Sequence, residues 1–250
     1  MENGSGPRQF ATTQWSLVIA ARSDENSRSQ ARRALEQLCR TYWYPLYAFV
    51  RGRGCSAEAA QDLTQAFFAR ILETGGFDSA DRERGRFRSY LLGAMKHFLA
   101  NEWHRGRTKK RGGELHFIEW DALAPESRYA EAPVHTDGPE QRFDREWALE
   151  TVAHALQALR EEKAVAGKLE QFEAFEPFLT GDGDQQSYRQ IGSRLEMSEG
   201  SVRVAVHRLR RSFGAQLREE IADTVIDQAD LDREVRYLLD VLQEAGGSGG

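Results

Sequence analysis

The sequence contains few cysteines and no long apolar run. Its two cysteines, Cys39 and Cys55, lack the spacing of a metal or redox motif, which argues against a disulfide scaffold and for a reducing compartment. Because no stretch of about 18 apolar residues occurs, no membrane span is expected. The opening residues, MENGSGPRQF, lack the basic-then-apolar pattern of a signal peptide. We therefore expect a cytoplasmic protein.

Familiar catalytic motifs are also missing. We find no nucleophile elbow, no Walker-type phosphate loop and no HExxH zinc motif. The six histidines are scattered, and His97 and His104 have no cysteine or carboxylate partner at ligand spacing. We expect no enzyme, with no catalytic residue, no metal and no cofactor. Metal-dependent turnover on DNA would revive the rival hypothesis of an enzyme.

Charge is distributed unevenly along the chain. The formal net charge of −5 by itself argues against nucleic-acid binding. However, residues 82–111 carry ten Lys/Arg against two acids, and 201–218 carry five Arg and no acid. Acids dominate in 112–146, with nine against three basic residues, and in 219–244, with nine against two. Such a chain can present two basic surfaces although its sum is negative.

Apolar residues recur at helical spacing, which predicts an all-α fold with two small helical domains. Early helices are expected around 33–50, from a cap at Ser56 to Ile71, and from Phe87 to Arg107. Residues 112–141 combine Gly, Pro and acids without a sustained period, which is typical of a linker. The expected divisions are an N-terminal extension (1–27), a first domain (28–111), an acidic linker (112–144), a second domain (145–215), a C-terminal helical extension (216–245) and a flexible Gly/Ser tail (246–250).

The segment Ser187–Phe213 predicts a helix-turn-helix. Ser187 can cap a short helix, Gly192 allows a second helix to come close, and Met197 fills the angle of the turn. Ser198 can cap the second helix, which has a single apolar stripe: Val202, Val206, Leu209 and Phe213. An ordinary amphipathic pair with a solvated basic face is the alternative.

The opposite face of the second helix is basic and free of acids, which suits the major groove of DNA. Arg203 and Arg208 are candidates for base edges, Arg210 and Arg211 for phosphates, and Val204 for a thymine methyl group. The full candidate set is Ser201, Arg203, Val204, His207, Arg208, Arg210 and Arg211.

Ser187–Phe213 resembles the C-terminal DNA-binding domain of bacterial sigma factors of the extracytoplasmic-function (ECF) type. The family pattern is roughly S-Y-x-x-I-A-x-x-L-x-x-S-x-G-T-V-x-x-x-x-x-R-x-R, from which the chain departs by Gly192 for Ala and Ser201 for Thr. Gln61–Phe67 resembles the family's E-D-L-V-Q-E-x-F, and Arg86–Leu92 resembles F-x-x-W-L. Two motif sets in the order found in the family make the resemblance more specific than either set alone.

The resemblance assigns two roles to the first domain. Its polymerase-docking residues would be Asp62, Gln65, Phe68 and Arg70. Its strand-capturing residues at the −10 element would be Tyr90, His97, Asn101, Trp103, His104, Arg105, Arg107, Lys109 and Lys110. Aromatic surface and a cationic rim suit unstacked bases, although core packing is the alternative for Tyr90 and Phe98. Ala66 replaces a usual Glu, Tyr90 a usual Trp, and His97 a frequent Asn.

The resemblance implies a bacterial sigma factor that binds the β′ clamp and β flap of core RNA polymerase and reads the −10 and −35 elements of promoter DNA. An inhibitory (anti-sigma) protein is a further expected partner. A polymerase-independent helix-turn-helix regulator is the alternative, but it leaves the first motif set unexplained. The C-terminal stretch has an apolar face, which we expect to fold back on the chain; docking of a partner is the other possibility. That face is formed by Leu231, Val235, Leu238 and Leu242.

Overall fold

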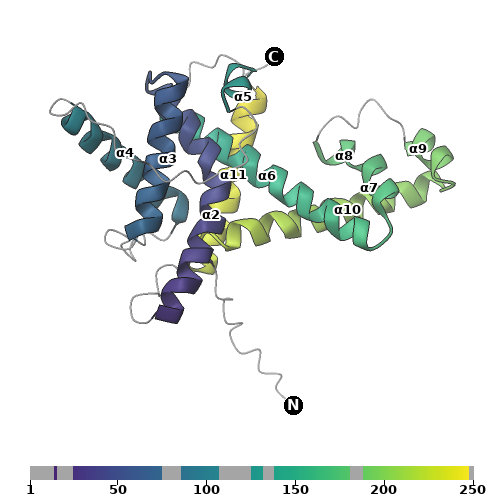
Figure 1. The fold of residues 1–250 in the computed structure, drawn as a ribbon. Helices are drawn as coiled ribbons and strands as arrows, with labels where there is room; N and C mark the ends of the chain where they lie inside the picture. The colour runs from purple at the N-terminus through teal and green to yellow at the C-terminus, as the bar shows by residue number, and fades with distance from the viewer. Residues whose placement is uncertain are drawn as a thin grey trace. The chain divides into compact units, whose positions relative to one another are not determined.

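The computed structural model describes residues 14–15, 25–74, 86–106, 125–131, 138–180 and 188–247. Within these ranges every named element is a helix, which confirms the all-α prediction for the described residues (Figure 1). None of these helices combines the length and the apolarity needed to cross a lipid bilayer. The chain divides into two compact units, one formed by 1–150 with 221–250 and the other by 151–220.

The described helices follow one another along the chain in this order. They are α2 (Glu25–Gly52), α3 (Ala57–Thr74), α4 (Phe87–Gly106), α5 (Pro125–Glu131), α6 (Pro139–Val165), α7 (Leu169–Phe175), α8 (Pro177–Thr180), α9 (Tyr188–Arg194), α10 (Glu199–Ala222) and α11 (Gln228–Gly247).

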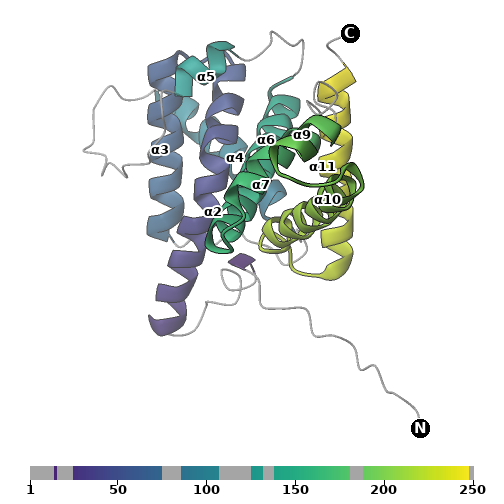
Figure 2. The same cartoon turned by 90° about the vertical axis from the view of Figure 1, so that its right-hand side faces the viewer.

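The core of the first unit is built around α2. Every residue from Tyr42 to Val50 is buried, so this part of the helix is covered on all sides. Helix α3 packs alongside it and buries Phe67 and Phe68 (Figure 2). Helix α2 ends at Gly52, and, as predicted, the Ser56 hydroxyl caps α3 by accepting a hydrogen bond from the Ala59 N–H at 3.2 Å.

Segments from both ends of the chain close over the start of α4. The Trp15 N–H donates to the Asp223 carbonyl, and the Phe87 N–H donates to the Thr224 carbonyl, each at 2.9 Å. The Trp15 ring lies 5.0 Å from Phe87 and 5.2 Å from Tyr90, measured between centroids. The start of α4 is therefore part of the core of the first unit.

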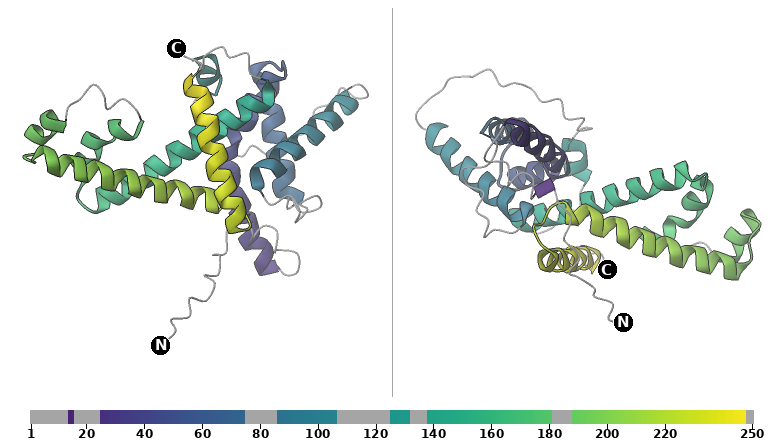
Figure 3. Two further views of the ribbon diagram at one scale, coloured as in Figure 1. Left: turned by 180° about the vertical axis from the view of Figure 1, so that it is seen from behind. Right: turned by 90° about the horizontal axis from the view of Figure 1, so that it is seen from below.

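Helix α11 packs on the first unit, which confirms the expected fold-back. Leu231 and Leu238 are buried, and the fully buried carboxylate of Glu234 pairs with Arg88 of α4. The Tyr237 hydroxyl donates to Asp144 of α6 at 2.7 Å. Figure 3 shows α11, in yellow, running along this unit.

Part of the expected linker is helical. Helix α5 lies within it, and α6 begins at Pro139, ahead of the predicted domain start at 145. The α5 carboxylate of Glu126 accepts hydrogen bonds from Arg51 at 2.7 and 2.9 Å. The segment expected to be a linker is therefore helical at these residues. A helix of seven residues held by ion pairs has too few apolar positions to produce a periodic signal.

The second unit has one apolar cluster, to which α7, α8, α9 and the unit's parts of α6 and α10 contribute. Phe172 and Phe175 come from α7, and Ile191 comes from α9. The predicted stripe of α10 is buried at Val202, Val206 and Leu209, whereas Phe213 is half-buried against the same cluster. This cluster fixes which face of α10 remains exposed.

Candidate nucleic-acid interface

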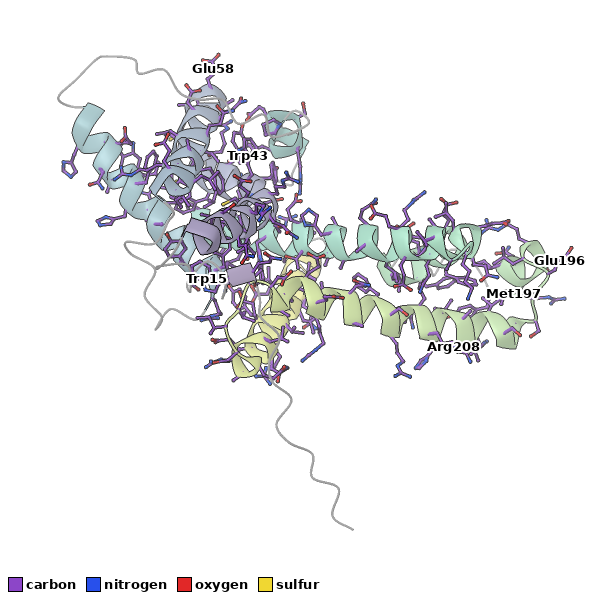
Figure 4. The ribbon with its side chains drawn as sticks, turned by 60° about the horizontal axis from the view of Figure 1, so that its bottom comes forward. Trp15, Trp43, Glu58, Glu196, Met197 and Arg208 are labelled. Atoms are coloured by element: carbon purple, nitrogen blue, oxygen red, sulfur yellow. The ribbon has the colours of Figure 1, made fainter. Side chains whose placement is uncertain are left out.

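The turn between α9 and α10 closes α9 with a Schellman motif. Glu196 has a left-handed backbone with φ 55°, and the Met197 N–H donates to the Gly192 carbonyl at 2.8 Å. Met197 then packs against the apolar cluster of the second unit, as the sequence predicts. Figure 4 shows Glu196 and Met197 together at this corner.

Gly192 permits the close approach that the turn requires. A Cβ atom on this residue would lie 2.5 Å from the Met197 carbonyl oxygen and 3.6 Å from Val202 Cγ2. The first distance is shorter than any real contact, so a side chain here would force the backbone to move. Gly192 was expected to let the second helix come close, but the limiting contact is the backbone of the turn, because Val202 of α10 lies at an ordinary contact distance.

The start of α10 is capped by Ser198. Its hydroxyl accepts a hydrogen bond from the Ser201 N–H at 3.1 Å and lies 2.8 Å from the Ser201 hydroxyl. The predicted cap is confirmed. The other expected cap, Ser187, lies outside the described residues.

The outer face of α10 is polar and carries no acid between 201 and 218. Its exposed residues include the base-edge candidate Arg208, labelled in Figure 4, and Val204, of which 50% is exposed. Because the buried stripe occupies the opposite side of α10, the whole outer face is available to enter a DNA groove. The predicted contacts found exposed on α10 are Ser201, Arg203, Val204, His207, Arg208, Arg210 and Arg211.

Two of these arginines have partners within the unit. Arg203 Nη2 lies 2.7 Å from Glu199 Oε1, and its guanidinium carbon lies 5.2 Å from the centre of the Tyr188 ring. Arg210 Nη2 donates to the Phe178 carbonyl at 3.1 Å, although Arg210 was expected to contact phosphate. Arg210 therefore also ties α10 to α8.

Helix α4 exposes polar and aromatic side chains on two of its sides. At helical spacing His97, Asn101 and His104 share one side, and Trp103 lies on another, together with Lys96. Trp103 is 47% exposed, and the guanidinium carbon of Arg53 lies 5.1 Å from its ring centre. Lys96 pairs with Glu140 at 3.0 Å, and this hydrogen bond holds the pKa of the Glu140 carboxyl below its usual range. The side that carries Trp103 thus combines an open aromatic ring with a cation.

Several predicted strand-capturing residues are not among these exposed side chains. Tyr90 is only 3% exposed because Trp15 and Phe87 pack against it, so its ring belongs to the core. Phe98 is buried too, against Phe67. The side chain of Arg105, and Arg107, Lys109 and Lys110 as a whole, lie outside the described residues.

The predicted polymerase-docking residues lie on α3, and they too include both exposed and buried side chains. Asp62 and Arg70 are exposed, and Gln65 is half-buried. Phe68, in contrast, is fully buried, with the Phe67 ring 5.5 Å away between centroids. Its expected role as a docking residue is corrected to core packing, since none of its side chain reaches the surface.

Two residues of these surfaces were not among the sequence candidates. Glu199 precedes Arg203 by four residues, a helical spacing at which an acid and a base commonly pair, so a search for such pairs finds it. Arg53 has no comparable signal, because only the tertiary structure places it beside Trp103.

Comparisons with protein families, with curated proteins and with solved structures find no match to this chain. Across the described ranges, no three His, Cys, Asp or Glu side chains gather as a metal-binding group.

Proposed function

We propose that this chain is a promoter-reading subunit of bacterial RNA polymerase, a sigma factor of the ECF type. The observation that carries the proposal is the exposed basic face of α10, which is free of acids from 201 to 218 and is presented by a capped helix behind a tight turn. A helix of this kind fits the major groove, where arginines read base edges and anchor to phosphates. In the proposed complex this helix reads the −35 element.

The exposed side chains of α4 supply the second contact of the proposal. Melted bases of the −10 element would stack on Trp103, while Asn101 and His104 offer polar groups to base edges. The adjacent Arg53 adds positive charge for the phosphates. With two separate contacts on one promoter, the position of the polymerase on the DNA is fixed.

The polymerase and an inhibitory protein are the proposed protein partners. Asp62, Gln65 and Arg70 on α3 would dock the β′ clamp, without help from the buried Phe68. The second unit would reach the β flap. Nucleotide addition belongs to the core enzyme, so the proposal assigns no catalytic group to this chain.

Run-off transcription tests the proposal directly. Purified chain and core polymerase are incubated with a genomic fragment library, and defined start sites with shared upstream elements are expected. Arg208→Ala should abolish most of this signal, whereas Arg40→Ala removes an exposed positive charge on α2 and should not. Binding to a palindrome without any association with core polymerase would favour the alternative, a polymerase-independent regulator.

A further inference from the structure

Arg203 on α10 is held from two sides. Glu199 accepts a hydrogen bond from its Nη2 at 2.7 Å, and Tyr188 of α9 lies beneath its guanidinium at 5.2 Å. The Tyr188 ring is itself fixed, since it stacks on Phe178 with centroids 4.9 Å apart and planes 15° apart. The guanidinium of Arg203 is thus oriented before any ligand arrives, although 64% of its side chain is exposed.

We propose that Glu199 and Tyr188 are positioning residues that orient Arg203 to read one guanine in the major groove. The inference rests on the proposed function and adds a specificity determinant to it. Guanine presents two acceptors, O6 and N7, and a planar guanidinium meets both at once. With Nη2 engaged by Glu199, Arg203 keeps other N–H groups free to face the base.

The pairing with Glu199 also favours base reading over phosphate binding. An arginine whose charge is neutralised by a carboxylate is attracted less to the DNA backbone, so it contributes less to sequence-independent affinity. The aromatic support from Tyr188 reduces the side-chain freedom that would be lost on binding. Both effects raise discrimination between sequences more than they raise affinity.

Glu199→Gln should therefore have two opposite effects. Affinity for arbitrary DNA should rise, because a negative charge near the phosphates is removed, while the preference for guanine at one position should fall by roughly tenfold. Glu196→Gln is the matched control, since it removes an exposed acid from the turn three residues earlier. It should raise affinity for arbitrary DNA and leave the guanine preference unchanged.

Tyr188 is tested by a conservative pair of variants. Tyr188→Phe keeps the ring and should keep the guanine preference, whereas Tyr188→Leu should lose it by a similar factor. Because Tyr188 also packs in the core, Tm is measured for both variants, and binding is measured well below it. In the free protein, the Arg203 side-chain protons should show an upfield ring-current shift in NMR that Tyr188→Leu removes.

Binding is measured on a duplex library with each base at every position of the upstream element. The proposal is overturned if Glu199→Gln keeps the full guanine preference, or if Tyr188→Phe loses it as completely as Tyr188→Leu. Wild-type protein that shows no base preference at any position overturns the proposed promoter-reading function, and the positioning role with it. If Glu199→Gln loses the guanine preference at the position that Arg203 reads and keeps the base preferences at other positions, the result supports the positioning role specifically.

Discussion

Arg88 of α4 and Glu234 of α11 form a buried ion pair across 146 residues of sequence, with Nε 2.7 Å from Oε1. Arg88 also pairs with Asp144, and its guanidinium lies 4.4 Å from the Tyr237 ring centre and 4.8 Å from that of Trp147. Burial alone would lower the pKa of Arg88, but the hydrogen bond and charge of Glu234 raise it. Arg88 is therefore charged at all working pH values and depends on its carboxylate partners.

Removing Glu234 should destabilise the first unit strongly. Glu234→Ala leaves the buried guanidinium of Arg88 without one of its carboxylate partners. Breaking a buried ion pair in this way lowers the free energy of unfolding by about 3–5 kcal/mol. Chemical denaturation measures the loss, and Asp240→Asn on the exposed side of α11 is the control, expected within about 0.5 kcal/mol of wild type. The double variant Arg88→Met/Glu234→Met should lose less than the sum of its single changes, because the buried guanidinium and carboxylate are removed together and Asp144 keeps its hydrogen bond from Tyr237. Strict additivity would contradict the coupling.

Gly192 and Gly214 should respond to alanine in opposite directions. Gly192→Ala places a Cβ 2.5 Å from the Met197 carbonyl, so we expect a loss of about 1–3 kcal/mol in the stability of the second unit. Gly214 lies inside α10 with nothing within 4 Å of the added Cβ. Gly214→Ala should add up to about 1 kcal/mol through helix propensity alone. Thermal unfolding compares the two, and a stabilised Gly192→Ala would show that the turn can relax.

Glu196→Gly should stabilise the helix-turn-helix. Glu196 has φ 55°, a left-handed conformation that costs an ordinary L-residue about 1–2 kcal/mol and glycine almost nothing. Part of that gain is offset by the greater freedom of glycine in the unfolded chain, so we expect about 0.5–1 kcal/mol net. Glu196→Ala serves as the comparison and should give no gain. If the two variants change the stability equally, the change results from the lost charge and not from the backbone conformation.

Trp103→Ala should weaken binding to single-stranded DNA. Stacking on an exposed ring is worth about 1–3 kcal/mol per base, and the effect should depend little on sequence. Trp103→Phe should recover part of the affinity because it keeps a ring. Val165→Ala, at a position 92% exposed at the end of α6, is the control. Fluorescence anisotropy with an oligonucleotide of the −10 type measures the change, and unaltered affinity would remove α4 from the proposed interface.

Alkaline pH should destabilise the first unit, and Tyr237 is one of the tyrosines that contribute, beside Tyr47, whose pKa burial also raises to about 12. Burial, together with the hydrogen bond to Asp144, raises the pKa of Tyr237 to about 12 from an ordinary value of 10.0. Since the pKa is higher in the folded state, the stabilising contribution is complete below about pH 10 and is lost as pH rises through about 12. Denaturation of Tyr237→Phe should show a flatter pH dependence in that window. An unchanged slope would place the alkaline sensitivity at other tyrosines.

The local features of this chain follow from residues close together in the sequence. Ser56 and Ser198 cap their helices with groups three residues away, and the stripe of Val202 and Val206 repeats at helical spacing. The sequence alone therefore predicts most of the helices, although not α5, and it predicts the turn and the basic outer face of α10. It also indicates that α11 has an apolar side to bury.

Only the tertiary structure decided which candidate residues reach the surface. Periodicity groups residues on a face but does not reveal what covers that face. Tyr90 is buried because Trp15 packs on it, and Trp103, on the same helix, remains open beside Arg53. The pairing of Glu234 with Arg88 likewise joins distant segments. Such contacts depend on long-range packing, so no pattern within a few residues could determine them.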